Sequence, residues 1–167
     1  VIADIETDSI DNVKNIWCIV CKDIHSHEVF SFVDPTSSNE FRDFASTVEC
    51  WIGHNFIRFD GRWLSRLLDI PLSASNVIDT LVLSRMLRYD LEGGHSLEAW
   101  GERLGHPKTK FDRFHEYGDD MLSYCKDDVT LNHLVYDFIM SRLGGDNWKE
   151  AIKVEMEMQY ICMDMQE

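Results

Sequence analysis

Basic residues and prolines are scarce in this 167-residue chain, and it contains no long apolar run. Lysine and arginine together number 16 against 30 acids, which gives a net charge of −14 at pH 7. A protein that clamps long stretches of duplex through the phosphates is usually basic, so this balance argues against a high-affinity duplex binder. An enzyme that grips a few nucleotides through bound metal ions stays possible, because such ions supply positive charge locally.

The missing signals also bear on location. No run of roughly 18 apolar residues is present, so we expect no segment to span a membrane. The opening VIADIETD carries acids at once with no basic region before them, which predicts no signal peptide. The five cysteines lack the spacing of a disulfide framework, which favours a cytoplasmic location over secretion. Cys18 and Cys21 lie three apart in an expected strand, hence on opposite faces, and are better explained as buried apolar residues than as zinc ligands.

The order of the expected elements indicates one mixed α/β domain. We expect strands at 1–7, 16–22, 28–33 and 50–54, and helices at 39–45, 58–68, 79–87, 97–104, 119–143 and from 146 to the end. Three successive strands with short connections suggest an antiparallel meander, and the later alternation adds helices packed on the sheet. The last helix carries an apolar stripe at Trp148, Ile152, Met156 and Met163 and ends without a stop signal. The chain is therefore expected to be part of something longer.

Two acids within an otherwise apolar first strand form the first candidate site. Asp4 and Glu6 are two residues apart, so both face one side of a strand while Ala3 and Ile5 face the other. Two carboxylates on one face repel each other unless a cation sits between them. From these residues alone, an early end to the strand with both acids solvated is an equal alternative.

A second candidate pair lies on the long helix expected at 119–143. Tyr124 and Asp128 are four residues apart and share a helix face beside an apolar stripe that includes Leu134. Asp127 falls about 100° round the helix and is expected at the surface. Tyrosine and aspartate are common on helix surfaces, so this pair alone is a weak indication.

The loop between a short strand and the following helix supplies the third candidate. Asp60 ends the sequence GHNFIRFD and begins the helix. Its simplest interpretation is a first-turn acid that interacts with the helix dipole, and Asn55 is equally consistent with a turn.

The three candidates taken in order are more specific than any one of them. D-x-E in the first strand, N-x-x-x-F-D in the middle and Y-x-x-x-D on the long helix resemble the three exonuclease motifs of the DEDD superfamily. Ser123 stands where the histidine subclass has its histidine, so the resemblance is to the tyrosine subclass. It places the four superfamily carboxylates on Asp4, Glu6, Asp60 and Asp128.

This resemblance implies 3′→5′ exonuclease chemistry with two Mg²⁺ or Mn²⁺ ions. All-oxygen ligands suit these ions, whereas zinc would favour histidine or cysteine. Asp4, Glu6 and Asp128 are expected to hold the metal that activates water. The resemblance also implies that Asp4 bridges to the second ion and that Asp60 supports this ion through water. Tyr124 is expected to orient the attacking water with Glu6 rather than to act as a base, since an unperturbed phenol has a pKa of about 10.

Weaker candidates for contact with the substrate are Thr7, Ile10, Asn55 and Phe59. Phe56 and Phe59 can stack on a base, but packing in the core is the more common role of aromatic residues.

Segments outside the motifs point to a particular family within the superfamily. IDTLVLSR at 78–85 and HSLEAWGERLG at 95–105 look like the proofreading domain of T7-like phage family A DNA polymerases, and this likeness covers nearly the whole chain. It implies a ribonuclease H-like α/β fold, a mixed sheet of three antiparallel strands plus parallel strands flanked by helices. It also implies an exonuclease domain over 1–145 and, over 146–167, a helix that starts the connection to a polymerase domain. The connection at 88–94 is shorter than the loop of that family.

The function implied is hydrolysis from the 3′ end of single-stranded or frayed DNA, releasing nucleoside 5′-monophosphates. A proofreading role in phage replication, in the host cytoplasm and with a covalently linked polymerase domain, is the expected setting. Two alternatives stay open. One is a stand-alone exoribonuclease of the same superfamily, because only contacts to the 2′-OH distinguish the sugars. The other is a catalytically silent scaffold domain of a polymerase.

Overall fold

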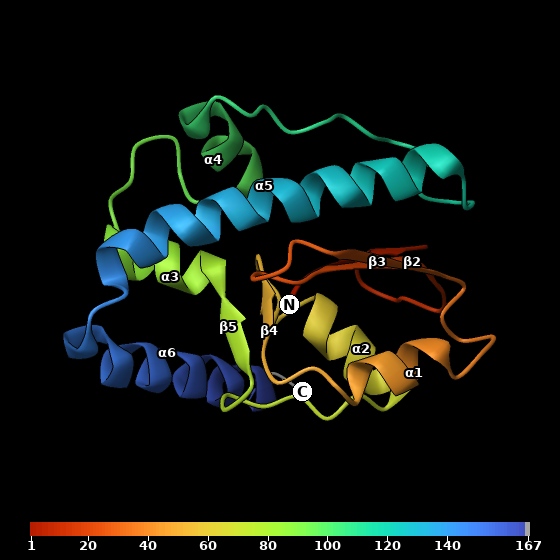
Figure 1. Cartoon of the computed structure of the whole chain (residues 1–167), viewed down its shortest axis with the longest axis horizontal. Helices are drawn as coiled ribbons and strands as arrows, with labels where there is room; N and C mark the ends of the chain where they lie inside the picture. The colour runs from red at the N-terminus through yellow and green to blue at the C-terminus, as the bar shows by residue number, and fades with distance from the viewer. Residues whose placement is uncertain (166–167) are drawn as a thin grey trace.

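Five strands form one mixed sheet in the computed structural model, which describes residues 1–165 (Figure 1). The strands are β1 (Ile2–Thr7), β2 (Ile16–Lys22), β3 (Val29–Val33), β4 (Trp51–Gly53) and β5 (Val77–Asp79). Their order across the sheet is β3-β2-β1-β4-β5. The first three pair antiparallel, and β4 and β5 run parallel to β1. The expected mixed sheet is therefore confirmed.

Helices cover both faces of this sheet (Figure 1). They are α1 (Glu40–Ala45), α2 (Asp60–Leu68), α3 (Thr80–Leu87), α4 (Leu97–Leu104), α5 (Asp119–Leu143) and α6 (Asp146–Asp164). The long helix α5 crosses one face over β1 and β2, while α1 and α2 lie on the opposite side. Helix α4 packs on α5, and α6 packs on α3 and β5.

The alternating pattern of β1 divides the core between the two faces. Ile2 packs with Val20 and Ile52 against apolar residues of α5. Ala3 and Ile5 pack in a larger cluster on the other side. Cys18 and Cys21 fall in these two different clusters, so their side chains lie on opposite faces of the sheet, as expected.

Local capping sets several helix ends. Ser96 Oγ accepts a hydrogen bond from the backbone N–H of Ala99, and Gly105 adopts the left-handed conformation (φ 69°) that ends α4. Both features agree with the sequence-based expectation. Asn39 precedes α1 as expected, but within residues 1–165 its side chain makes no capping bond.

Two features differ from what the sequence predicts. Strand β5 has no counterpart among the expected strands, because three residues next to a helix are too short to show a period. Leu134 is expected in the apolar stripe of α5, but it is 42% exposed and belongs to neither apolar cluster of the core. Within residues 1–165 no helix is both long and apolar enough to cross a bilayer.

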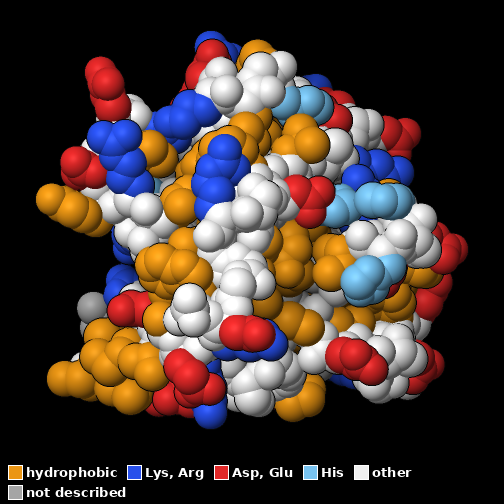
Figure 2. Space-filling model, turned by 60° about the vertical axis from the view of Figure 1, so that its left-hand side comes forward, with side chains coloured by type: hydrophobic (Ala, Val, Ile, Leu, Met, Phe, Trp, Pro, Cys, Tyr) orange, Lys and Arg blue, Asp and Glu red, His pale blue; other side chains and the backbone are white. Residues whose placement is uncertain are grey.

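The final helix α6 is only partly buried. Met156 is enclosed, with its sulfur 3.4 Å from the backbone N of Asp79. Apolar side chains remain exposed on α6 at Trp148, Val154, Met158 and Ile161. Figure 2 shows hydrophobic side chains at the surface beside the end of the described chain. Of the connection expected over 146–167, residues 166–167 lie outside the described part.

Candidate active site

The first strand delivers two acids to the face that α5 covers. Asp4 and Glu6 point to the same side as Ile2, while Ala3 and Ile5 pack on the other side. The β1–β2 pairing shifts register between Glu6 and Thr7. Such bulges re-aim side chains and are common beside active sites. The expectation that both carboxylates share one face is therefore met, and the strand does not end before them.

Helix α5 packs on β1 and brings its own side chains next to these acids. Cys125 Sγ lies 3.4 Å from both the carbonyl oxygen and Oδ2 of Asp4. One ligand atom each of Asp4, Glu6 and Cys125 lies within 4.8 Å of the other two. Tyr124 and Asp128 flank Cys125 on the same helix and are both buried. The packing of α5 on β1 thus brings the first and third motifs together.

Asp60, from the middle motif, joins them at the start of α2. It is the first residue of α2 and is 4% exposed. Its Oδ1 accepts a hydrogen bond from the backbone N–H of Ile5, at 3.0 Å, between the two acids of β1. This contact fixes the start of α2 to the strand. The alternative of an isolated acid that serves only the helix dipole is inconsistent with this position.

Burial raises the pKa of all four acids, and repulsion among them adds to this for Asp4, Glu6 and Asp60. Burial first, and Asp128 second, raise the pKa of Asp4 to about 7. Burial, followed by Asp4, raises the pKa of Glu6 to about 10. Burial also raises the pKa of Asp60, with Asp4 adding to it, and the pKa of Asp128. Four carboxylates in this arrangement need positive charge to be ionised together.

The donor set fits a hard divalent cation. Asp128 Oδ1 is buried and has no hydrogen-bond partner among the residues that the structure describes. Burial raises the pKa of the Cys125 thiol well above its usual value, so this sulfur stays protonated and is a poor ligand. Carboxylate oxygens are the ligands that Mg²⁺ and Mn²⁺ prefer. Asp4, Glu6, Asp60 and Asp128 can therefore hold such ions.

Lys108 was not found from the sequence, although it lies in the middle of the site. It follows α4 in an irregular segment, and its Nζ is 2.7 Å from Asp128 Oδ2. Burial alone lowers its pKa, but the charge of Asp128 and a hydrogen bond to it raise the pKa overall. Lys108 is therefore a cation at neutral pH.

Tyr124 is held by aromatic neighbours. Its ring stacks on that of Phe111, with 5.3 Å between the ring centroids, and packs edge to face with Phe114, with 6.2 Å between the centroids. Burial raises the pKa of the phenol, and the hydrogen bond to Lys108 offsets this only in part. The phenol stays protonated at neutral pH, which agrees with an orienting role and not with that of a base.

Asp79 is a second residue whose importance the sequence did not reveal. Its carboxylate is 2% exposed and accepts hydrogen bonds from the backbone N–H groups of Asn55 (2.9 Å), Ile57 (3.1 Å) and Leu81 (2.9 Å). Asn55 has a left-handed backbone with φ 59°. The Asp79 carboxylate thus fixes the loop that carries Asn55 and leads to Asp60.

We expect Asp79→Ala to lower the free energy of unfolding by roughly 3 kcal/mol, because it leaves one buried and two partly buried N–H groups without an acceptor. Urea denaturation followed by circular dichroism measures this loss. Asp43→Ala is the matched control, since Asp43 is exposed on α1, and it should change stability by less than about 0.5 kcal/mol. Equal stability of the two variants would contradict the role given to Asp79.

A cavity of about 520 Å³ opens beside the acids. It is lined by Asp4, Asp128, Lys108 and residues that include His54, Asn55 and His95. Burial lowers the pKa of His54 to about 4, so its ring is neutral. His54 Nδ1 lies 2.9 Å from Thr80 Oγ1, and its Nε2 has no partner among the described residues.

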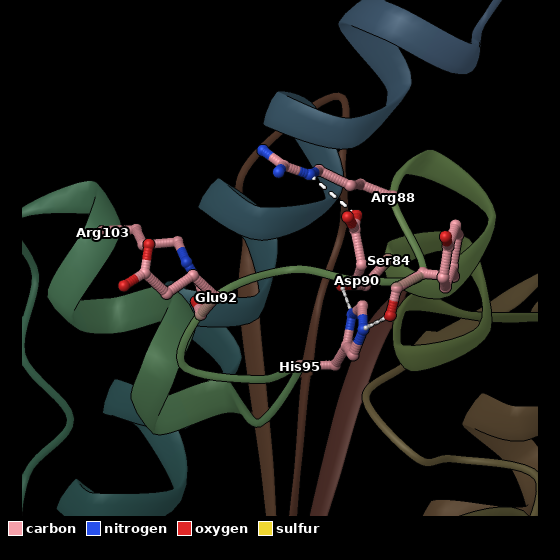
Figure 3. A network of polar contacts seen from close by, with 7 residues as sticks. Ser84, Arg88, Asp90, Glu92, His95 and Arg103 are labelled. Carbon is pink, nitrogen blue, oxygen red and sulfur yellow. Dashed lines mark hydrogen bonds and ion pairs between the residues drawn. The ribbon is translucent and has the colours of Figure 1, made fainter.

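His95, which lines this cavity, lies in the connection between α3 and α4 and is part of a network of polar contacts (Figure 3). His95 Nε2 donates to the carbonyl oxygen of Tyr89, at 3.1 Å, and Nδ1 shares a hydrogen bond with Ser84 Oγ, at 2.7 Å. Trp100 Nε1 in turn donates to Ser84 Oγ. Arg103 adds hydrogen bonds to backbone carbonyls of the same connection. The short 88–94 segment is thus tied down at several points.

The weaker substrate candidates lie in different surroundings. Asn55 lines the cavity beside Asp4. The Thr7 side chain is buried and its hydroxyl donates to the carbonyl oxygen of Ser9, whereas Ile10 is 77% exposed. Phe59 is partly buried against the core, and Phe56 is fully buried. Packing is therefore the observed role of Phe56, as expected.

Comparison with known proteins adds the family. A family profile described as 3′-5′ exonuclease matches residues 1–166. The DNA-directed DNA polymerase of Escherichia phage T7 is 24% identical over 182 aligned residues. The alignment covers 85% of this chain and 25% of the polymerase, so the chain spans about a quarter of that relative.

Two solved structures share the fold. Brucella melitensis NrnC bound to pGG superposes with a TM-score of 0.76 at 16% identity, covering 99% of this chain and 83% of that one. Exonuclease X in complex with 5′ overhanging duplex DNA gives a TM-score of 0.54 at 17% identity, covering 91% of this chain and 98% of that one. The fold is thus that of ribonuclease H-like exonucleases, as the sequence motifs implied.

Proposed function

Because this chain belongs to the 3′-5′ exonuclease family, we propose that it hydrolyses phosphodiester bonds from the 3′ end of DNA with two divalent metal ions. Asp4, Glu6, Asp60 and Asp128 hold the ions in this proposal. Mg²⁺ and Mn²⁺ are the ions that the oxygen donors favour. NrnC, which shares the fold, has also been solved with bound Mg²⁺.

One observation carries the proposal. Acids from β1, the start of α2 and the middle of α5 come close enough to interact electrostatically at one largely buried site, although up to 124 positions separate them in the sequence (Asp4 to Asp128). Such a cluster is costly unless cations neutralise it, so a purely structural role gives no reason for it. The unpartnered Asp128 Oδ1 adds an open ligand position.

The residues of the chain then have distinct tasks. Bound divalent ions supply a nucleophilic water at neutral pH and neutralise charge on the leaving oxygen. Glu6 accepts a hydrogen bond from the attacking water, and the protonated phenol of Tyr124 orients that water from the other side. The aromatic packing around Tyr124 keeps its position fixed. The hydrogen bond from the backbone N–H of Ile5 fixes Asp60 relative to Asp4 and Glu6.

DNA is the proposed substrate and proofreading the proposed role. The sequence relatives from phages T7 and T3 are DNA polymerases, and the match covers a quarter of their length. A polymerase domain linked after α6 accounts for the apolar side chains that this helix leaves exposed. The domain then runs over 1–145, with 146–167 as the start of the connection.

A digestion assay tests the proposal. With Mg²⁺, a 5′-labelled single-stranded DNA should shorten stepwise from its 3′ end to nucleoside 5′-monophosphates, and a mismatched primer end should be trimmed faster than a paired one. EDTA should stop both reactions. A matched RNA oligonucleotide serves as the comparison. Faster digestion of RNA would favour the exoribonuclease alternative, and no digestion of either would favour the silent scaffold.

A further inference from the structure

Lys108 brings a single positive charge into the cluster of acids. Its Nζ lies 2.7 Å from Asp128 Oδ2 and 5.1 Å from the centre of the Tyr124 ring. Its charge also stabilises ionised Asp4 and so lowers the pKa of that carboxyl. Among the ion pairs between described residues, only that of Lys108 with Asp128 involves one of the four acids.

The ammonium and a divalent ion need the same carboxylate. Lys108 holds Asp128 Oδ2, while Oδ1 of the same carboxylate has no partner in the described chain. A divalent ion on Asp128 would place like charges a few ångströms apart, and a buried site screens such repulsion poorly. The two cations therefore compete for Asp128.

A place for the displaced ammonium exists next to the acids. Lys108 lines the cavity of about 520 Å³ that contains Asp4, and it also lines a neighbouring cavity of about 670 Å³ that reaches Tyr124 and Phe111. Its side chain is a quarter exposed, and its four-carbon stem rotates freely. A small rotation moves the ammonium from Asp128 into these cavities.

We propose that Lys108 exchanges with a divalent ion at Asp128 and, once displaced, binds a phosphate of the substrate. In the metal-free protein the ammonium neutralises part of the acidic cluster. Metal binding releases it into the cavities, so the positive charge faces the nucleic acid only when the site is loaded. This inference rests on the proposed function, since it requires metal and a phosphodiester substrate at the same site.

Calorimetric titration with Mn²⁺ at pH 8 tests the exchange. Lys108→Met keeps the apolar stem and removes the charge, so it should bind Mn²⁺ about tenfold more tightly than the parent chain. Lys108→Arg keeps the charge and should bind with near-parental affinity. Lys110→Met is the matched control, because Lys110 is exposed two residues further on and lines the larger cavity without an ion pair to the acids among the described residues.

Salt dependence of DNA binding tests the phosphate contact. With Mg²⁺ and a phosphorothioate-protected single-stranded oligonucleotide, Lys108→Met should reduce the slope of log K against log salt by about 0.7, the value for one phosphate contact on a single strand. In EDTA the variant and the parent should have equal slopes, because Asp128 then retains the ammonium.

The outcomes separate the inference from the proposed function. A parent chain that binds no Mn²⁺ overturns both. A parent chain that binds Mn²⁺ while Lys108→Met binds it equally or more weakly overturns only the exchange. Equal salt slopes for the two proteins with Mg²⁺ overturn the phosphate contact.

Discussion

Asp4→Ala is expected to abolish nuclease activity, with a loss of at least about 10³-fold in the rate of 3′-end digestion. Asp4 lies between the other acids, and its charge affects Glu6 and Asp60 directly. Bound metal contributes several kcal/mol to the transition state, and each 1.4 kcal/mol or so corresponds to a factor of ten. Asp128→Ala should have the same effect. Digestion of a labelled primer with Mg²⁺ measures both.

The loss must not come from unfolding, and Asp4→Asn tests this. Burial raises the pKa of Asp4 from 3.8 to about 7, so the metal-free protein loses stability as the pH rises from about 4 to about 7, and the full cost is present at pH 8. The amide removes this cost, and at pH 8 in EDTA the variant should melt at or above the parental temperature. Asp127→Ala, next to Asp128 but exposed, should keep the parental rate. Parental activity in Asp4→Ala would refute the site.

Tyr124→Phe is expected to slow digestion about 10²-fold without abolishing it, because misplacing a reacting group by about 1 Å can cost this much. The metal ligands remain in the variant, and Phe111 and Phe114 keep the ring in place. The phenol of Tyr124 stays protonated, so the expected loss of rate comes from losing its orienting contact with the water and not from losing a base. Single-turnover kinetics with Mn²⁺ in excess measures the chemical step.

Tyr136→Phe is the matched control for Tyr124→Phe, since Tyr136 is a partly buried tyrosine on the same helix and away from the acids. It should digest DNA at the parental rate. If Tyr124→Phe were as inactive as Asp4→Ala, the phenol would do more than position water. If it had the parental rate, Tyr124 would have no part in the reaction.

The sequence predicted the main features of the site because they follow local rules. The two-residue period of a strand places Asp4 and Glu6 on one face, and the helical period places Tyr124 and Asp128 on another. Which faces meet is a tertiary property, and the resemblance to known motifs supplied it. The structure confirms the mixed sheet and brings the four acids together; their catalytic roles stay predictions.

Lys108 and Asp79 escaped prediction for a different reason. Lys108 lies in an irregular segment, so no periodicity indicates where its side chain points. Asp79 ends a three-residue strand, and its partners include Asn55, 24 positions earlier. Contacts of this kind depend on the path of the loops across the surface, which neither propensity nor hydrophobic pattern specifies.

The single long helix α5 carries both Tyr124 and Asp128, whereas β1 carries Asp4 and Glu6 and holds Asp60. The site therefore lies between a long helix and the sheet, both regular elements, and not among flexible loops. The spacing of Tyr124 and Asp128 is set by α5 alone, and the spacing of Asp4, Glu6 and Asp60 is set by the sheet side of the site. A small shift of α5 along the sheet would therefore change all the distances between its two site residues and the three acids at β1 together.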